Sequence, residues 1–405
     1  MAVANTPDTL NGLFKEVYAK KLENLVPDGV KLLREIPFAT QTERTGKTYN
    51  QPVILGHEHG VTFAASNEDA VALNPAVAGQ IENASVQGNM LVLRSVMGYK
   101  SASASIGSAQ AFEQATKFLV GNMLRSVTKK LEIEMLYGQV GYGTVASVAG
   151  AVISIPAAEW APGIWAGAEK MPIEIRNAAG GTSRGTANIT AVDFVNKTIT
   201  VDVLPAGTVA TDVIWHKGAY GKEFAGLHKI ISNTGVLFGI DASQYSLFRG
   251  NTYDAGAAPL SMAKVEDAIT KAVEKGLDND VMVLVNPFTW SDLLTEQAAK
   301  RMYDSSYSSA KTTNGSKEIE FYGQNGMIKI VPSIYCKQGY AYVLSTEDMI
   351  RIGSSDVTFK RPGKEGEFFL DLPEMTAYEL RLFCDQALFV STPAKNVLIS
   401  NIVVS

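Results

Sequence analysis

A single long amphipathic segment, Ser108 to Tyr137, constrains this chain more than any other feature of its sequence. Its apolar residues recur at steps of three or four, which places them on one face of an α-helix. These residues are Phe112, Ala115, Leu119, Met123, Val127, Leu131 and Met135. Gly138 follows at the expected C-terminal cap. At ~1.5 Å per residue the helix is ~45 Å long, so it is predicted to be a spine on which other segments pack.

Two predicted strands precede this helix. Lys47 to Leu55 and Gly88 to Lys100 both read as strands, and we expect them to form the two sides of a long hairpin-like loop. The tip between them, Gly56 to Gln87, holds few large apolar residues. Because such a tip cannot bury a core of its own, it is expected to lie on a partner. Further upstream, Thr9 to Leu25 has a helical apolar period, which predicts an arm that docks elsewhere.

A stretch rich in Ala, Gly, Val and Thr, from Gly141 to Lys222, predicts a small β-rich insertion after the helix. Within it, the alternation around Asn196 and Lys197 indicates a β-hairpin. The stretch Val145 to Ala168 contains Glu159 as its sole charge, but prolines and glycines interrupt it. Because a membrane-spanning helix needs ~20 uninterrupted apolar residues, no membrane segment is expected.

The rest of the chain mixes helices and strands. A helix is predicted at Met262 to Lys275, a buried strand at Val281 to Val285 and a second helix at Phe288 to Tyr303. Strands follow in GMIKIVPSIY, YAYVLS and AYELRLFCDQALFVSTPAKNVLI. The pattern is that of an α+β protein of two or three lobes, which 405 residues accommodate.

Composition narrows the possible functions. The formal net charge of −5 argues against tight binding of nucleic-acid phosphates, which needs a clustered excess of Lys and Arg. Cys336 and Cys384 are the only cysteines and lack CxxC spacing, so no disulfide framework or thiolate metal site is expected and a reducing cytoplasm fits. The N-terminal residues lack the basic segment and apolar run of a secretion signal.

One motif imitates a hydrolase site. Gly181 to Gly185 matches G-x-S-x-G, in which Ser183 would need His216 or His228 as its base. A helix should follow the serine in that motif, but the sequence TANIT predicts a strand. We therefore interpret the motif as a turn in the insertion.

Two further motifs imitate ligand sites. Thr45 to Thr48 contains the GKT ending of a phosphate-binding loop, but Gln41 stands where the leading glycine belongs and a strand is predicted to follow. His57 and His59 offer two imidazoles on one face of a strand, yet no third metal ligand is close in sequence.

Acidic pairs complete the candidates. Glu68–Asp69 and Glu132/Glu134 are interpreted as solvated faces or inter-subunit ion pairs, because neighbouring carboxylates without a pocket imply no separation of pKa values. We predict no catalytic residue, no cofactor-binding residue and no metal ligand, and hence a protein that is not an enzyme.

The order of these elements resembles the Hong Kong 97 type fold of tailed-phage capsid proteins. The resemblance spans nearly the whole chain and has three local anchors. They are KLENLVPDGVKLLREIPF in the arm, DVMVLVNPFTWSDLL in the mixed lobe and ELRLFCDQALFVSTPAKNVLI at the end. It implies an N-terminal arm at 1–46, an extended loop at 47–100, the spine helix of the peripheral domain at 101–140, a β-rich insertion at 141–222, an axial domain at 223–345 and a return to the peripheral domain at 346–405.

The resemblance implies a major capsid protein that self-assembles into pentamers and hexamers of an icosahedral shell around a double-stranded DNA genome. Such a protein would reside in the virion after assembly in the cytoplasm of a bacterial host. Its expected partners are further copies of itself, a separate scaffolding protein, a portal and a cement or decoration protein, without sequence-specific DNA binding and without a membrane. An encapsulin-like nanocompartment shell is the alternative with the same fold, and a serine hydrolase using Ser183 is the alternative from another class.

Two departures from the family carry information. Some relatives join a loop lysine to an asparagine of a neighbour, but no lysine occurs between Lys47 and Lys100, so noncovalent locking or a separate cementing protein is expected. Other relatives carry a scaffolding segment before the arm, and this chain has none, which implies a separate scaffolding protein or a processed chain.

Overall fold

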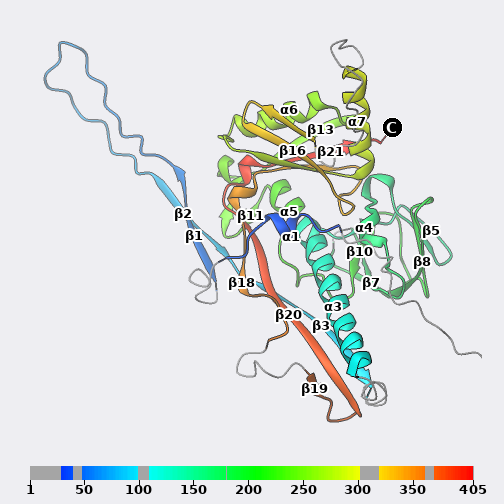
Figure 1. Cartoon of the computed structure of the whole chain (residues 1–405). Helices are drawn as coiled ribbons and strands as arrows, with labels where there is room; N and C mark the ends of the chain where they lie inside the picture. The colour runs from blue at the N-terminus through cyan, green and yellow to red at the C-terminus, as the bar shows by residue number, and fades with distance from the viewer. Residues whose placement is uncertain are drawn as a thin grey trace, which may run out of the picture.

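Three lobes and one projecting loop surround helix α3, Ala109–Tyr137, in the computed structural model (Figure 1). The structure describes residues 29–39, 48–98, 109–178, 180–301, 319–360 and 369–404, without the side chains of 109–118, 297–301 and 319. The predicted spine helix is confirmed, whereas the predicted arm helix at Thr9 to Leu25 lies outside the described residues. No helix in the described ranges is long and apolar enough to cross a membrane.

The peripheral lobe packs α3 along a four-stranded antiparallel sheet (Figure 1). Its strands are β3 (Asn89–Gly98), β18 (Met349–Thr358), β19 (Phe369–Asp371) and β20 (Ala377–Val390). The long central strand β20 pairs with β3 along one edge and with β18 and β19 along the other. Alternate residues of β20, among them Leu382 and Cys384, share a buried core with Val127 and Leu131 of α3.

The second strand of the extended loop is not the one predicted. Strand β1, Tyr49–Gly56, pairs with β2, Gln80–Val86, in antiparallel register. The predicted partner, Gly88 to Lys100, contains β3, which pairs with β20 instead. The reason is physical: β2 has the polar sequence QIENASV, without the apolar run that marks β3 as a strand. Its pairing with β1 is exposed and leaves little hydrophobic signal in the sequence.

The axial lobe is a six-stranded mixed sheet of order β13-β21-β17-β14-β16-β15, with α6 on one of its faces (Figure 1). Its elements are α5 (Leu227–Ser232), β11 (Val236–Leu237), β12 (Ile240–Asp241), β13 (Asn251–Ala258), α6 (Met262–Val273), β14 (Val281–Val285), α7 (Pro287–Arg301), β15 (Ile319–Gly323), β16 (Gly326–Pro332), β17 (Ala341–Leu344) and β21 (Val397–Ile402). The predicted strand Val281 to Val285 is confirmed and fully buried. Ser261 caps α6 by accepting a hydrogen bond from the Lys264 N–H at 3.3 Å.

The insertion forms a separate lobe with a seven-stranded sheet of order β4-β10-β7-β8-β9-β6-β5. Its elements are β4 (Gly143–Thr144), β5 (Ser147–Ala149), β6 (Val152–Ser154), α4 (Pro162–Trp165), β7 (Pro172–Arg176), β8 (Ser183–Asp193), β9 (Thr198–Val201) and β10 (Val213–His216). The predicted hairpin is confirmed: Asp193 of β8 faces Thr198 of β9 across a turn containing Lys197, whose φ is +55°.

The apolar stretch Val145 to Ala168 is exposed around strand β5 and mostly buried from Trp160 to Ala168, and its sole charge contacts the axial lobe. Glu159 accepts hydrogen bonds from the Lys337 ammonium at 2.5 Å and from the Tyr340 hydroxyl at 2.9 Å, both in the axial lobe. Burial by itself raises the pKa of Glu159, but Lys337 and the two hydrogen bonds hold it below its ordinary value. The side chain of Lys337 is buried and lies over the ring of Tyr137 at the end of α3. A buried ion pair therefore joins the insertion to the axial lobe.

The last turns of α3 contact every other part of the body. The carboxylate of Glu132 accepts backbone N–H bonds from Lys31, Leu32 and Leu33, each at 2.9 Å, where the short helix α1 (Leu32–Glu35) begins. The Tyr137 hydroxyl donates to the Tyr335 carbonyl at 3.1 Å. Glu132 thus holds residues 29–36 on the spine by satisfying N–H groups that a helix start leaves unpaired.

Gly138 directly follows the last residue of α3, as predicted for the cap. The left-handed residue is the next one, Gln139, with φ +65°. A Cβ atom on Gly138 would lie 2.2 Å from the Phe224 carbonyl oxygen, so the glycine permits the close passage of the chain leaving the insertion.

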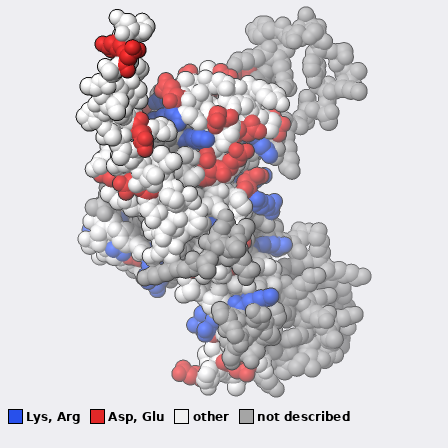
Figure 2. All heavy atoms as spheres, turned by 90° about the vertical axis from the view of Figure 1, so that its left-hand side faces the viewer, with Lys and Arg blue, Asp and Glu red and all other residues white. Residues whose placement is uncertain are grey.

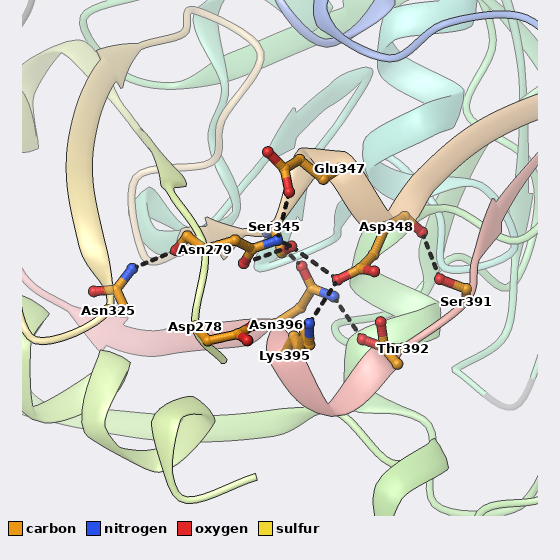
Figure 3. Close-up of polar contacts among 10 residues, drawn as sticks. All are labelled: Asp278, Asn279, Asn325, Ser345, Glu347, Asp348, Ser391, Thr392, Lys395 and Asn396. Carbon is orange, nitrogen blue, oxygen red and sulfur yellow. Dashed lines mark hydrogen bonds and ion pairs between the residues drawn. The ribbon is translucent and has the colours of Figure 1, made fainter. Parts of the chain in front are cut away.

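Two chain crossings connect the axial and peripheral lobes, and Figure 3 shows the polar network between them. One crossing runs from β17 to β18 through Ser345 and Asp348, and the other from β20 to β21 through Lys395 and Asn396. The Asn396 side-chain oxygen accepts from the Ser345 N–H at 2.9 Å, and the Ser345 hydroxyl donates to Asp348 at 2.9 Å. Lys395 lies 3.7 Å from Asp348 in the other crossing and 3.3 Å from Asp278. These contacts fix one crossing against the other.

The buried Glu159–Lys337 pair generates a stability prediction. Lys337→Met leaves the Glu159 carboxylate without its cation, and we expect a loss of ~3–5 kcal/mol in the free energy of unfolding. The double variant Glu159→Leu/Lys337→Met removes both charges and is expected to recover most of that loss. Chemical denaturation measures both. A double variant as unstable as the sum of its two single variants would contradict the pairing.

Candidate assembly surface

The extended loop exposes apolar side chains that a soluble body would bury. Val53 and Leu55 of β1 are partly buried against the main core, so they face inward. Ile54 and Ile81 are directly opposite each other across the β1–β2 pair and are both exposed. The two isoleucines therefore form an apolar cross-strand pair on the outer face of the loop.

The tip of the loop, residues 57–79, also carries a pair of exposed apolar side chains, one from each side. The Asn74 N–H donates to the Thr62 hydroxyl at 2.8 Å and thereby joins the two sides of the tip. Phe63 and Leu73, the next residue on each side, are 88% and 85% exposed. Large apolar side chains this exposed on a thin two-stranded projection mark an interaction surface.

The same loop is uniformly acidic. Between Thr48 and Leu93 the sequence contains Glu58, Glu68, Asp69 and Glu82 but no Lys or Arg. Figure 2 shows the projecting loop at the upper left with red atoms near its end and no blue atoms. The prediction that Glu68 and Asp69 are solvated agrees with their exposed side chains. The loop thus presents apolar side chains together with negative charge.

A surface of complementary character lies on the outer face of β3 and β20. Met90, Val92 and Val96 alternate along β3 and are exposed. Arg94 lies between them and directly opposite Arg381 of β20. This face, called the arginine face below, combines exposed apolar side chains with two guanidinium groups.

A single buried carboxylate orients both arginines. Glu379 is 3.3 Å from Arg94 Nε and 2.8 Å from Arg381 Nε, while the arginine side chains remain 65% and 44% exposed. The hydrogen bond from Arg381, together with the charge of both guanidinium groups, lowers the pKa of Glu379. Asp385 lies on the same face of β20, opposite Met90, so this face holds two carboxylates and two arginines, and its exposed positive charge is local to Arg94 and Arg381. Sequence reasoning missed this face because the two arginines are 287 positions apart and only the β3–β20 register brings them together.

The hydrolase motif is not assembled into a site. Ser183 begins β8 opposite Arg176, whereas His216 of β10 is level with Ala187, four residues further along. At ~3.3 Å per residue this separates serine and imidazole by roughly 13 Å along the strands, with β7 between them. His216 instead lies 3.0 Å from the Lys130 ammonium, and burial followed by the charges of Lys130 and Lys129 lowers its pKa.

The other candidate residues are likewise dispersed. His57 and His59 are exposed at the start of the loop tip, and no group of three metal-ligating side chains occurs among the described residues. His228 contacts the Tyr342 hydroxyl at 3.0 Å. Thr48 is followed at once by β1, as expected, while residues 45–47 of the GKT motif lie outside the described part of the chain. Cys384 is a free buried thiol, and burial raises its pKa to about 12.

The interpretation of Glu132 and Glu134 as solvated or inter-subunit groups is wrong. Both side chains are buried, because tertiary packing turns this part of the helix surface toward the arm and the insertion. Glu134 accepts from the Phe224 N–H at 3.1 Å, and burial together with the charge of Glu223 raises its pKa to about 8. Glu223 accepts from the Gln139 N–H and from the Tyr142 hydroxyl, and burial raises its pKa to about 7.

Comparison with known proteins identifies the fold. No family model matches the sequence, and no curated protein matches it. Among solved structures, the chain is similar to the capsid of cyanophage A-1(L), with a TM-score of 0.61 and 12% identity over 98% of this chain and 99% of that one. The capsid of a native GTA particle matches with a TM-score of 0.52 and 10% identity over 99% of this chain and 100% of that one. The chain therefore has the fold of these capsid proteins.

The buried Glu134 predicts a pH-dependent stability difference. Folded Glu134 keeps its proton up to a pH of about 8, whereas the unfolded chain releases it above about 4.5, so this group's contribution to stability falls as the pH rises between those values. Glu134→Gln mimics the protonated form and still accepts from Phe224. Thermal unfolding is expected to show that the free energy of unfolding of Glu134→Gln, relative to that of the wild type, rises between pH 5 and pH 8 by on the order of a few kcal/mol.

Glu266→Gln, which changes an exposed carboxylate on α6, is the matched control and is expected to follow the wild type at every pH. If the difference in free energy of unfolding between Glu134→Gln and the wild type stays constant from pH 5 to 8, the raised pKa of Glu134 is contradicted.

Proposed function

We propose that this chain, which has the fold of phage capsid proteins, is the major capsid protein of a tailed bacteriophage. In this role it assembles into pentamers and hexamers of an icosahedral shell around double-stranded DNA and works by self-association rather than catalysis. The division into arm, extended loop, spine helix, insertion, axial domain and return is part of this proposal. The site of assembly would be the host cytoplasm, and a scaffolding protein, a portal and a decoration protein would be its partners.

The observation that carries the proposal is the projecting loop with its exposed apolar side chains. Burying a side chain such as Phe63 or Leu73 against a partner contributes ~1.5–3 kcal/mol, which the isolated subunit forgoes. The loop and the arginine face are different patches of one molecule. A contact between unlike patches is head-to-tail, and such contacts close into rings when the rotation per subunit allows it.

Electron microscopy and analytical ultracentrifugation of the chain, expressed alone and with its neighbouring genes, test the function. Shells or capsomer rings are expected for the wild type. Phe63→Ser/Leu73→Ser is expected to reduce particle yield at least tenfold while changing the stability of the subunit by less than ~0.5 kcal/mol, because both side chains are already in solvent. A monomeric wild type under both conditions, or normal yield from the double variant, contradicts the proposal. Shells loaded with an enzyme instead of DNA would identify a nanocompartment.

A charge-reversal series tests the contact between the acidic loop and the arginine face. Arg94→Glu is expected to suppress assembly by like-charge repulsion, and so is Glu68→Lys/Asp69→Lys. Combining the three substitutions in one chain restores opposite charges and is expected to restore particles. Light scattering at increasing salt provides the second measurement, since exposed charge pairs weaken with ionic strength. If the combined variant does not form particles, the loop contacts a surface of its neighbour other than the arginine face.

A further inference from the structure

A two-residue turn next to the loop base breaks a local sequence preference. Strands β11 and β12 are joined by Phe238 and Gly239, whose φ angles are +55° and +85°. Hairpin turns with two positive φ angles strongly favour Asn-Gly, because a bulky side chain is unfavourable in the left-handed conformation. A residue that violates local preference in this way is expected to be required by a tertiary contact.

The contact that Phe238 makes is with the extended loop and the peripheral sheet. Its carbonyl oxygen accepts a hydrogen bond from the Ser85 N–H of β2 at 2.8 Å. Its ring lies 5.7 Å from the buried ring of Phe389 in β20, in a T-shaped arrangement. Tyr49, the first residue of β1, packs on the same Phe389 ring at 5.5 Å. One aromatic residue of the body therefore joins the hairpin turn to the base of the loop.

A second attachment lies further out along the same strand. The Gln80 side-chain amide donates a hydrogen bond to the hydroxyl of Tyr245, which follows β12. Gln80 and Ser85 are the outer and inner attachment points on β2, and at ~3.4 Å per residue they are ~17 Å apart. Two attachments at this separation determine the direction of a strand, whereas one would leave it free to pivot.

The inner part of the loop also packs on the body, since Ala84 and Val86 of β2 are buried and Val53 and Leu55 of β1 are partly buried against the main core. A cavity of about 320 Å³ lies between the hairpin and the loop base, lined by Val86 and Gln87 on the loop and by Leu237, Phe224 and Leu388 on the body. Packing therefore holds the inner end of the loop, and the space beside the hairpin leaves the contacts of Phe238 and Tyr245 as further restraints on the angle of its outer part.

We infer that residues 236–245 form a brace that sets the angle at which the extended loop leaves the body, with Phe238 and Tyr245 as its positioning residues. The brace acts on the direction of the loop without contacting the next copy through its own side chains. Its consequence for a shell rests on the proposed function: the brace angle limits which curvature a ring of copies adopts.

Spin labels measure the angle in the unassembled subunit. Cysteines replace two exposed residues, Ser66 in the loop tip and Glu266 on α6, and the native thiols are buried and do not compete for label. Double electron–electron resonance at subunit concentrations below assembly is expected to give one narrow distance distribution. Phe238→Asn suits the turn and removes only the ring, so the subunit is expected to stay folded while the distance distribution at least doubles in width.

Phe194→Asn is the matched control, because it removes an aromatic ring from the turn of another hairpin, β8–β9, and is expected to leave the distribution narrow. Tyr245→Phe, which deletes only the hydroxyl that Gln80 contacts, is the milder second variant and is expected to broaden the distribution less. An unchanged distribution in both brace variants, or a wild type already as broad as Phe238→Asn, overturns the brace.

Particle size separates this inference from the proposed function. If wild type assembles and Phe238→Asn gives particles of mixed diameter, the brace has the inferred effect. If wild type never assembles, the proposed function fails, while the resonance measurement still decides whether the brace holds the loop.

Discussion

The structure depends on the way the last two turns of α3 satisfy polar groups from three directions at once. Glu132 binds the backbone of the arm, Glu134 binds the chain leaving the insertion, and Tyr137 binds the axial lobe at Tyr335. A buried carboxylate is costly unless hydrogen bonds satisfy it, so each of these contacts is specific as well as attractive. The helix therefore determines where each lobe sits, and the ion pair between Glu159 and Lys337 then joins two of those lobes directly.

This rigid body contrasts with the loop that leaves it. One core joins all three lobes and a second lies between α6 and the axial sheet, whereas the loop is a single pair of strands that exposes isoleucine, phenylalanine and leucine to solvent. A two-stranded hairpin is marginally stable in water by itself, which is why its base contacts and brace matter. The molecule thus combines a firmly positioned body with a projecting surface that gains free energy only when another molecule covers it.

The proposed assembly depends on the placement of charge as well as on exposed apolar area. The charged side chains of the loop are all negative, whereas the arginine face presents two exposed guanidinium groups, Arg94 and Arg381, beside the carboxylates of Glu379 and Asp385. Opposite charges on unlike patches favour head-to-tail contact between copies and oppose contact between identical patches. The ionisable side chains of Lys130, Glu134 and Glu223 lie inside the body and belong to the docking of the lobes rather than to this surface.

The sequence by itself determined several elements in which the residue pattern corresponds to burial. The spine helix, the helix after Ser261, the buried strand at Val281 to Val285 and the hairpin around Lys197 were all predictable, because each shows a helical period, a continuous apolar run or a turn signal. Only the tertiary structure decided which strand pairs with β1, that Glu132 and Glu134 are buried, and that Arg94 meets Arg381 across a shared carboxylate. These outcomes depend on residues far apart in the chain, and a local pattern holds no information about such partners. Phe238 is the instructive case, because a residue unsuited to its own turn is explained by an aromatic contact 151 positions away.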